Sequence, residues 1–156
     1  MAVFRKGYAN VSANIDTVVV THDVKRAVTE ANLPHGIVLV FVPVGSSGLA
    51  LLESDPKIYE DYKKWIEAQV PASQEKRPDR KSGTGRNYAH LRAQLVGHSV
   101  QIPIAENRLQ IGSWQEVVLF DFDDKIGRRE FFILVLGEAA GGGGGAGGGG
   151  GGFGGF

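Results

Sequence analysis

The sequence predicts an α+β domain over residues 1–138, followed by a glycine-rich tail at 139–156. Segments rich in β-branched and aromatic residues open the chain and fill most of its second half. Between them, apolar residues recur with the period of an α-helix. Helices and strands that occur in separate groups along a chain are typical of the α+β class.

The first strands and the first helix follow from local patterns. Strands are expected at 3–14 and 16–22. A helix is expected from Thr21, the predicted N-cap, because four apolar residues share one helical face: Val24, Ala27, Val28 and Ala31. The almost entirely apolar segment 37–44 predicts a strand that is covered on both faces.

Residues 45–56 are expected to form a turn that leads into a second helix. Asp55 is suited to be the N-cap of this helix, and Pro56 is suited to its first position. Pro71 is expected to end the helix. Its predicted buried side consists of Ile58, Tyr62, Trp65 and Ile66.

The second half is predicted to begin with a long polar loop at 71–86 and a short helix at 87–97. Four strands are then expected, at 99–104, 109–112, 114–122 and 128–138. The last two flank the short segment "DDKIG", which predicts an antiparallel hairpin.

Composition excludes several classes of function. Lys plus Arg and Asp plus Glu both number 17, so no overall field recruits nucleic acid or an anionic membrane, and the barrier to self-association is low. The absence of cysteine excludes disulfides and thiolate metal sites. Without a visible secretory signal or an apolar run of membrane-spanning length, the expected location is the cytoplasm; an extracellular fibre reached by another route stays open.

The second half carries a series of motifs in a fixed order. They are Ala89-His90-Leu91, Leu95-Val96-Gly97, Ile102-Pro103-Ile104, Asn107-Arg108-Leu109, Ile111-Gly112-Ser113-Trp114-Gln115, Arg128-Arg129 and Gly137-Glu138. This series resembles the YjbQ family, also described as secondary thiamine-phosphate synthases. The resemblance covers residues 1–138 and implies a mixed β-sandwich with flanking helices that assembles as a homotrimer. It also implies a histidine-rich pocket between subunits and a thiamine-phosphate synthase activity.

The resemblance places the pocket on three segments, of which this chain keeps only part. Glu53 matches the family glutamate, and the third pocket histidine is present as His90. Val44 stands where the first histidine is expected, and Asp79 lies near the position of the second. Because imidazoles titrate near neutrality and bind metals as neutral donors, the loss of two of them argues against the family chemistry here.

The residual site is therefore predicted as His90 and Glu53 in catalytic positions, with five candidate binding residues: Ser46, Asp79, Arg80, Lys81 and Asn87. Each has a structural alternative, such as packing of His90 or a helix N-terminal role for Glu53. We expect no cofactor and no dedicated metal site, although this set could hold a hard cation weakly.

Three further groups were weighed as sites. Asp121, Asp123 and Asp124 look like a calcium cluster, but they fall on the expected hairpin turn and supply too few oxygens. The basic loop at 76–86 lacks the P-loop pattern and is expected to be solvated or to pair with a neighbouring subunit. Trp114 and Gln115 are expected to pack in the sheet and at an interface.

The tail "GGGGGAGGGGGGFGGF" poses a separate question, because glycine loses the most backbone entropy on ordering. Fixing its residues costs on the order of 20 kcal/mol, whereas two buried phenylalanines return about 2–3 kcal/mol each. Backbone contacts would have to supply the rest, either as a strand added to a sheet edge or as packed polyglycine helices, with Phe153 and Phe156 as anchors. An unstructured low-complexity tail is the alternative.

Three functions from different classes follow. The first is a structural, self-assembling trimer that lacks the family catalysis and is joined through its tail, plausibly into a filament. The second is an enzyme with thiamine-phosphate synthase-like activity in a rebuilt pocket. The third is a binder of small phosphate-bearing ligands. The sequence favours the first and leaves enzymatic activity undecided, leaning against it.

Overall fold

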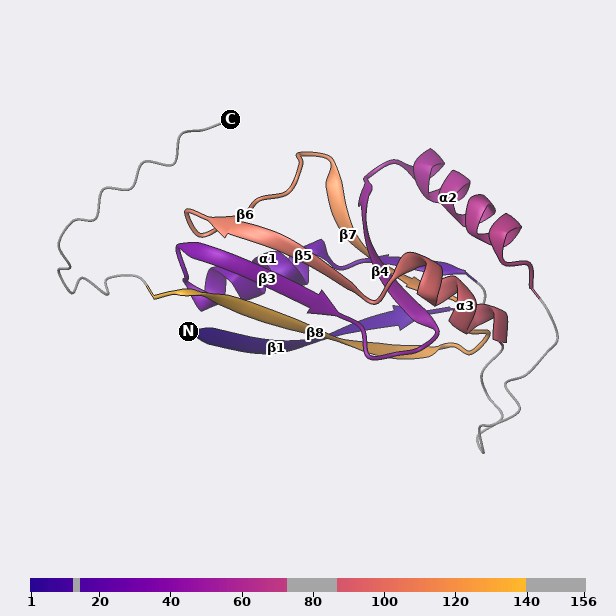
Figure 1. Cartoon of the computed structure of the whole chain (residues 1–156), viewed down its shortest axis with the longest axis horizontal. Coiled ribbons are helices and arrows are strands. Elements are labelled where there is room, and N and C mark those ends of the chain that lie inside the picture. Colours follow the sequence, from indigo (N-terminus) through magenta and orange to yellow (C-terminus); the bar gives the residue numbers. More distant parts are fainter. Residues whose placement is uncertain (13–14, 73–86, 140–156) are drawn as a thin grey trace, which may run out of the picture.

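The computed structural model describes residues 1–12, 15–72 and 87–139 (Figure 1). Its elements are, in chain order, β1 (Ala2–Val11), β2 (Asp16–Val19), α1 (Thr21–Ala31), β3 (His35–Phe41), β4 (Ser47–Glu53), α2 (Pro56–Gln69), α3 (Asn87–Val96), β5 (Ser99–Ala105), β6 (Arg108–Leu109), β7 (Gln115–Asp121) and β8 (Gly127–Glu138). The predicted α+β class is confirmed. No helix in these ranges is long and apolar enough to cross a membrane.

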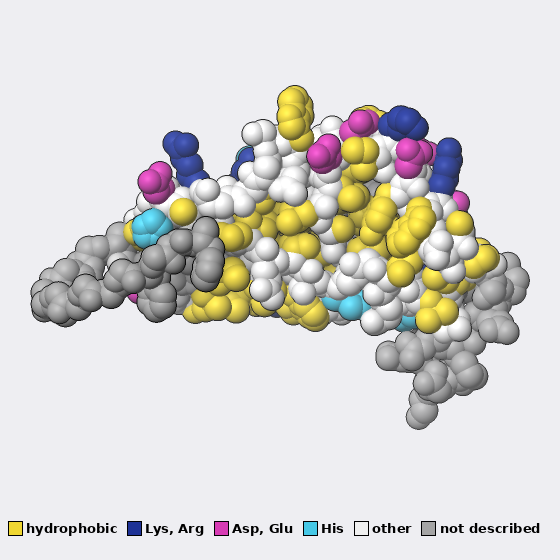
Figure 2. All heavy atoms as spheres, turned by 45° about the horizontal axis from the view of Figure 1, so that its top comes forward, with side chains coloured by type: hydrophobic (Ala, Val, Ile, Leu, Met, Phe, Trp, Pro, Cys, Tyr) yellow, Lys and Arg dark blue, Asp and Glu magenta, His cyan; other side chains and the backbone are white. Residues whose placement is uncertain are grey.

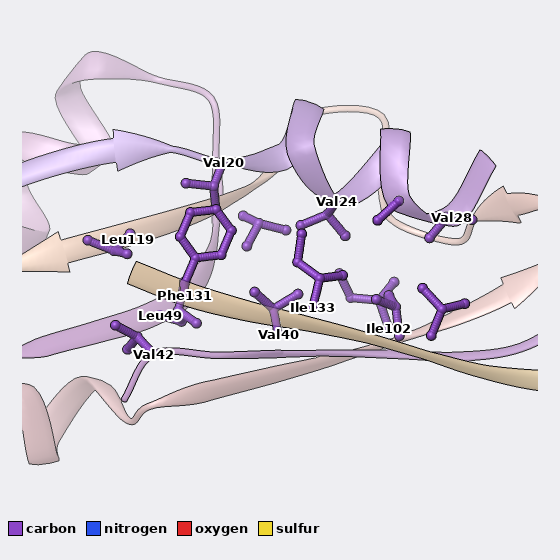
Figure 3. Packing of buried hydrophobic residues seen from close by; sticks show 14 of the residues in the cluster. Val20, Val24, Val28, Val40, Val42, Leu49, Ile102, Leu119, Phe131 and Ile133 are labelled. Carbon is purple, nitrogen blue, oxygen red and sulfur yellow. The ribbon is translucent and has the colours of Figure 1, made fainter. Parts of the chain in front are cut away.

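The strands form two sheets. The larger sheet has the order β1-β8-β3-β5-β6, and the smaller has the order β2-β7-β4. Every strand pair in the described residues is antiparallel. Buried side chains of the larger sheet, such as Val40, Ile102 and Phe131, meet those of α1 in one core (Figure 3). The smaller sheet contributes Leu49 and Leu119 to the same core.

β7 separates two cores, which explains the apolar run at its centre, residues 117–120. Val117 and Leu119 face the core shared with the larger sheet and α1. Val118 and Phe120 point the other way, into a second cluster with Ile66 of α2 and with Ala89 and Ala93 of α3. Successive residues of a strand point to opposite faces, so consecutive apolar residues are expected where a strand lies between two cores.

The first helix keeps its predicted face but not its predicted cap. All four expected core residues of α1 are buried: Val24, Ala27, Val28 and Ala31. The N-cap position is Val20, which makes no side-chain capping bond, and Thr21 is the first helical residue. The Thr21 hydroxyl instead accepts a hydrogen bond of 2.8 Å from the Val117 N–H, so it joins the helix to β7.

The second helix begins as predicted. Asp55 is the N-cap, and its carboxylate accepts a 2.8 Å hydrogen bond from the Lys57 N–H, with Pro56 at the first position. Ile66 is buried, but the prediction for Trp65 was wrong, because its side chain is 47% exposed. Its ring stacks on Tyr62 at 5.9 Å between centroids and so lies at the rim of the cluster.

Two predictions about strands were wrong. Residues 47–53 form β4 rather than a turn, and this strand pairs with β7 along its whole length. β7 and β8 do not form a hairpin, because β7 pairs with β2 and β4 whereas β8 pairs with β1 and β3. The loop between them therefore crosses from one sheet of the sandwich to the other.

β3 was predicted to be covered on both faces, but within residues 1–12, 15–72 and 87–139 only one face is covered. Val38 and Val40 are fully buried, whereas Ile37 and Phe41 are 36% and 40% exposed. The buried side faces α1 and the smaller sheet (Figure 3). The opposite side of the larger sheet is an apolar surface that is still in contact with solvent.

Candidate functional site

His90 lies where α3 meets the turn that precedes β4. A Cβ atom added to Gly45 in this turn would come within 2.9 Å of His90 Nδ1. Glycine therefore allows the imidazole to approach the backbone closely. Ser46, the next residue, is 5% exposed, and its carbonyl accepts a 3.0 Å hydrogen bond from the Phe122 N–H. The structure thus brings together His90 and Ser46, two of the predicted site residues.

Glu53 lies at the opposite end of β4. Six residue steps separate it from Ser47, and at about 3.3 Å per residue these span roughly 20 Å. Glu53 is exposed and is paired in the sheet with Gln115. Within one protomer, therefore, Glu53 is remote from His90, and a site that used both groups would have to combine different protomers.

The other predicted site residues divide between α3 and the parts outside the described residues. Asn87 is the first residue of α3, three positions before His90 and hence on the same helical side. Asp79, Arg80, Lys81, Phe153 and Phe156 fall outside the described residues. The expectation that Trp114 packs in the sheet was wrong, because Trp114 lies in the turn before β7 and is 74% exposed. The Gln115 side chain accepts a 2.8 Å hydrogen bond from the Gly112 N–H.

A buried polar cluster, which the sequence did not reveal, lies next to the Gly45–Ser46 turn. Asp121 is fully buried and accepts hydrogen bonds from the Ser47 hydroxyl at 2.8 Å and from Arg129 Nε and Nη2 at 3.0 and 3.2 Å. Burial raises the pKa of Asp121, and the hydrogen bonds from Arg129 and Ser47 partly offset that effect. Arg129 also donates to the Lys125 carbonyl at 2.7 Å.

This cluster gives the two-arginine motif a structural role. Arg129 fixes the loop that carries the chain from β7 to β8, whereas Arg128 points outward and lies 4.3 Å from the Tyr8 ring centroid. Asp121 was considered only as a calcium ligand, but its carboxylate is engaged by Arg129 and Ser47. Across the described residues, no three His, Cys, Asp or Glu side chains are grouped to hold a metal ion.

The solvent-facing side of the larger sheet forms a second candidate site, which we call the outer apolar face. Residues directly opposite in the register point to the same side of a sheet. Phe4 lies opposite Leu134, which lies opposite Leu39; Phe132 lies opposite Phe41. The large aliphatic and phenylalanine side chains on this side of β1, β3 and β8 are Phe4, Ile37, Leu39, Phe41, Phe132, Leu134 and Leu136, and the Lys6–Glu130 ion pair lies at their edge.

The aromatic members of this face contact one another. The Phe132 ring lies 5.3 Å from that of Phe4 and 6.5 Å from that of Phe41. Phe4, Phe41 and Leu136 are each at least 40% exposed. In Figure 2, hydrophobic side chains spread across the middle and lower part of the view, whereas charged side chains gather along its upper edge. Contiguous apolar surface of this kind marks an interaction site.

Comparison with known proteins places the chain in a family. Residues 8–138 match the model of the UPF0047 protein YjbQ-like family. The chain belongs to the YjbQ family. The match ends where the predicted domain ends, and the tail lies outside it.

Relatives and solved structures agree with this assignment. A UPF0047 protein of Archaeoglobus fulgidus is 30% identical over 115 residues, which cover 74% of this chain and 87% of the relative. The YugU protein of Bacillus subtilis is 27% identical over 105 residues, or 67% and 77% of the two chains. A YbjQ-like protein of unknown function from Sulfolobus solfataricus has the same fold, with a TM-score of 0.80, 24% identity and coverage of 88% and 99%.

Proposed function

We propose that this YjbQ-family chain is a structural, self-assembling subunit: a homotrimer built on the outer apolar face and extended into a higher assembly by its glycine-rich tail. The exposed aromatic surface of the larger sheet is the observation that carries the proposal. Three neighbouring strands, β1, β8 and β3, lie about 4.8 Å apart and are paired over at least seven residues, which gives this face a projected area of roughly 330 Å². Apolar patches larger than a few hundred Å² are uncommon on monomeric proteins.

A closed ring of three requires two different surfaces that fit each other. The second surface in this proposal is on α3, where Leu91 and Leu95 are 50% and 43% exposed and lie one helical turn apart. Packing of the outer apolar face of one protomer on these leucines of the next would bury both surfaces. It would also place His90, the neighbour of Leu91, at the subunit boundary.

The composition of the pocket supports a structural role over catalysis. Of the three histidines that the family resemblance implies, only His90 is present, and Val44 occupies the first position. The close approach of His90 to Gly45 leaves no room for a side chain at residue 45. A single imidazole beside a serine can bind a polar ligand or move one proton, but it cannot form a three-histidine centre.

The test is the mass of the assembly, measured by size exclusion with light scattering and negative-stain electron microscopy. The full chain is expected to form particles larger than a trimer, and a chain truncated after Glu138 is expected to form trimers. Phe41→Lys and Leu91→Lys in the truncated chain should each give monomers, because each places a charge in the interface. The matched control is Ile126→Lys, at a 79% exposed position outside both surfaces.

Two outcomes would contradict this proposal. If truncation leaves the mass unchanged, the tail does not extend the assembly. If Phe41→Lys and Leu91→Lys remain oligomeric while still folded by circular dichroism, the interface lies elsewhere on the molecule.

Thiamine-phosphate synthase-like activity is the second candidate, favoured by the close approach of His90 to the turn that carries Ser46. Turnover that is lost in both His90→Ala and Glu53→Ala would support it. Because these groups lie at opposite ends of β4, activity restored by mixing the two variants would show that each site takes them from different protomers.

A further inference from the structure

A cavity of about 250 Å³ lies between α1 and the turn that joins β5 to β6. Its walls are formed by Lys25, Val28 and Thr29 of α1 and by Asn107, Arg108 and Leu109. We propose that this cavity binds a small phosphate monoester, with Lys25 and Arg108 contacting the phosphate. This proposal concerns a different part of the molecule from the outer apolar face and does not depend on the assembly.

The charges around the cavity are unbalanced. Among the described residues, neither Lys25 nor Arg108 forms an ion pair, whereas nearby Arg5 and Arg26 are paired with Glu30 and Asp23. Two cations that line one small cavity repel each other, and an anion placed between them removes that repulsion. Lys25 and Arg108 both line the cavity, whereas the nearby acidic residues Glu30, which is paired with Arg5, and Glu106 do not contribute to its walls.

The turn that carries Arg108 is held in place by hydrogen bonds. Glu106 and Asn107 both have positive φ, at 52° and 61°, which makes a tight reversal between β5 and β6. The Asn107 N–H donates to the Pro34 carbonyl at 3.1 Å. The Gln110 amide donates to the Ala105 and Arg108 carbonyls at 3.2 Å each. The backbone of Arg108 is therefore fixed before any ligand arrives, which lowers the entropy lost on binding.

The remaining walls indicate the class of ligand. Val28 is 2% exposed and Leu109 is partly buried, so they provide an apolar floor. The Thr29 hydroxyl donates to the Lys25 carbonyl within α1, which leaves the Lys25 ammonium, the Arg108 guanidinium and the Asn107 amide as donors to a ligand. A phosphate offers three terminal oxygens and up to two charges, more than a carboxylate does. The apolar floor favours an ester over free phosphate.

Isothermal titration calorimetry on the full chain, with phenyl phosphate as the probe, tests this site. Phenyl phosphate is expected to bind saturably, inorganic phosphate more weakly, and phenol not at all. Arg108→Gln and Lys25→Gln should each raise the Kd about tenfold or more, because each removes a charge-assisted contact. Lys64→Gln, which removes one exposed charge from α2, is the matched control and should leave the Kd unchanged.

Backbone amide NMR shifts in the same titration should move at residues 25–29 and 106–110. The proposal is overturned if phenyl phosphate does not bind saturably, if Arg108→Gln and Lys25→Gln bind as the wild type does, or if Lys64→Gln loses as much affinity as they do. Light scattering on the same samples separates this result from the assembly proposal, because the variants should keep the wild-type mass.

Discussion

Replacing Arg129 by methionine should destabilise the protein strongly, because it leaves a charge unpaired in the interior. Arg129 is 12% exposed, and it makes two hydrogen bonds, of 3.0 and 3.2 Å, to the fully buried Asp121. Removing one partner of a buried ion pair costs about 3–5 kcal/mol. For a chain of this length the melting temperature should fall by roughly 6–20 °C.

The neighbouring arginine supplies the control. Arg128 lies 4.3 Å from the ring centroid of Tyr8, which is 48% exposed. An exposed cation–π contact is worth about 0.5–1 kcal/mol, so Arg128→Met should cost far less than Arg129→Met. Urea unfolding followed by circular dichroism measures both values under identical conditions.

The loss of stability caused by Arg129→Met should become smaller as the pH is lowered. Burial raises the pKa of Asp121 above its ordinary value of 3.8, so the folded state holds this proton to a higher pH than the unfolded state does. The contribution of Asp121 to stability is therefore present below pH 3.8 and is lost as the pH rises through the folded pKa. Without Arg129 that pKa rises further, and the deficit relative to wild type should be largest at neutral pH and shrink on acidification. An equal cost for the two arginine variants, or a deficit independent of pH, would refute this reasoning.

Two further predictions concern packing and capping. Gly45→Ala should destabilise the wild type, because the added Cβ would lie 2.9 Å from His90 Nδ1, and it should be close to neutral in a His90→Ala background. A double-mutant cycle should give a coupling free energy of about 1 kcal/mol. Additive effects of the two substitutions would contradict the contact. Asp55→Ala should lower the free energy of unfolding by about 1 kcal/mol, because it removes the capping hydrogen bond from the Lys57 N–H. Asp61→Ala removes an exposed ion pair with the Lys57 side chain and should lower it by less than about 0.5 kcal/mol. Thermal melts compare the two aspartate variants, and equal shifts would argue against capping.

Local sequence patterns predicted the helices well, because the signals for a helix come from residues that are close together in the chain. The 3.6-residue spacing of Val24, Val28 and their neighbours defined the buried face of α1, and the Asp55–Pro56 pair marked the start of α2. Thr21 shows the limit of such rules: its hydroxyl bonds to β7, which is 96 residues away in the chain. Rules for helix ends use only the neighbouring residues and therefore cannot identify so distant a partner.

The arrangement of strands depends on non-local contacts, and there the sequence was less informative. The short connection before β8 favoured a hairpin, but β8 pairs instead with β1 and β3 from the first half of the chain. The apolar run from Leu49 to Leu52 could have revealed β4, but the flanking Gly, Ser and Pro residues favoured a turn. For the candidate site, the motifs indicated His90 but not its roughly 20 Å separation from Glu53, which follows from the extended path of β4.

The pairing of β1 with β8 has a consequence for how the protein is made. Ala2 pairs with Leu136, so the first strand emerges from the ribosome long before β8, its neighbour in the larger sheet. At about 5–20 residues per second, the 133 intervening residues take roughly 7–27 s to synthesise. During that interval Phe4 and the unpaired edge of β1 are exposed to other nascent chains. Arg5 and Lys6 directly follow Phe4, and they place charge where such premature strand pairing would begin.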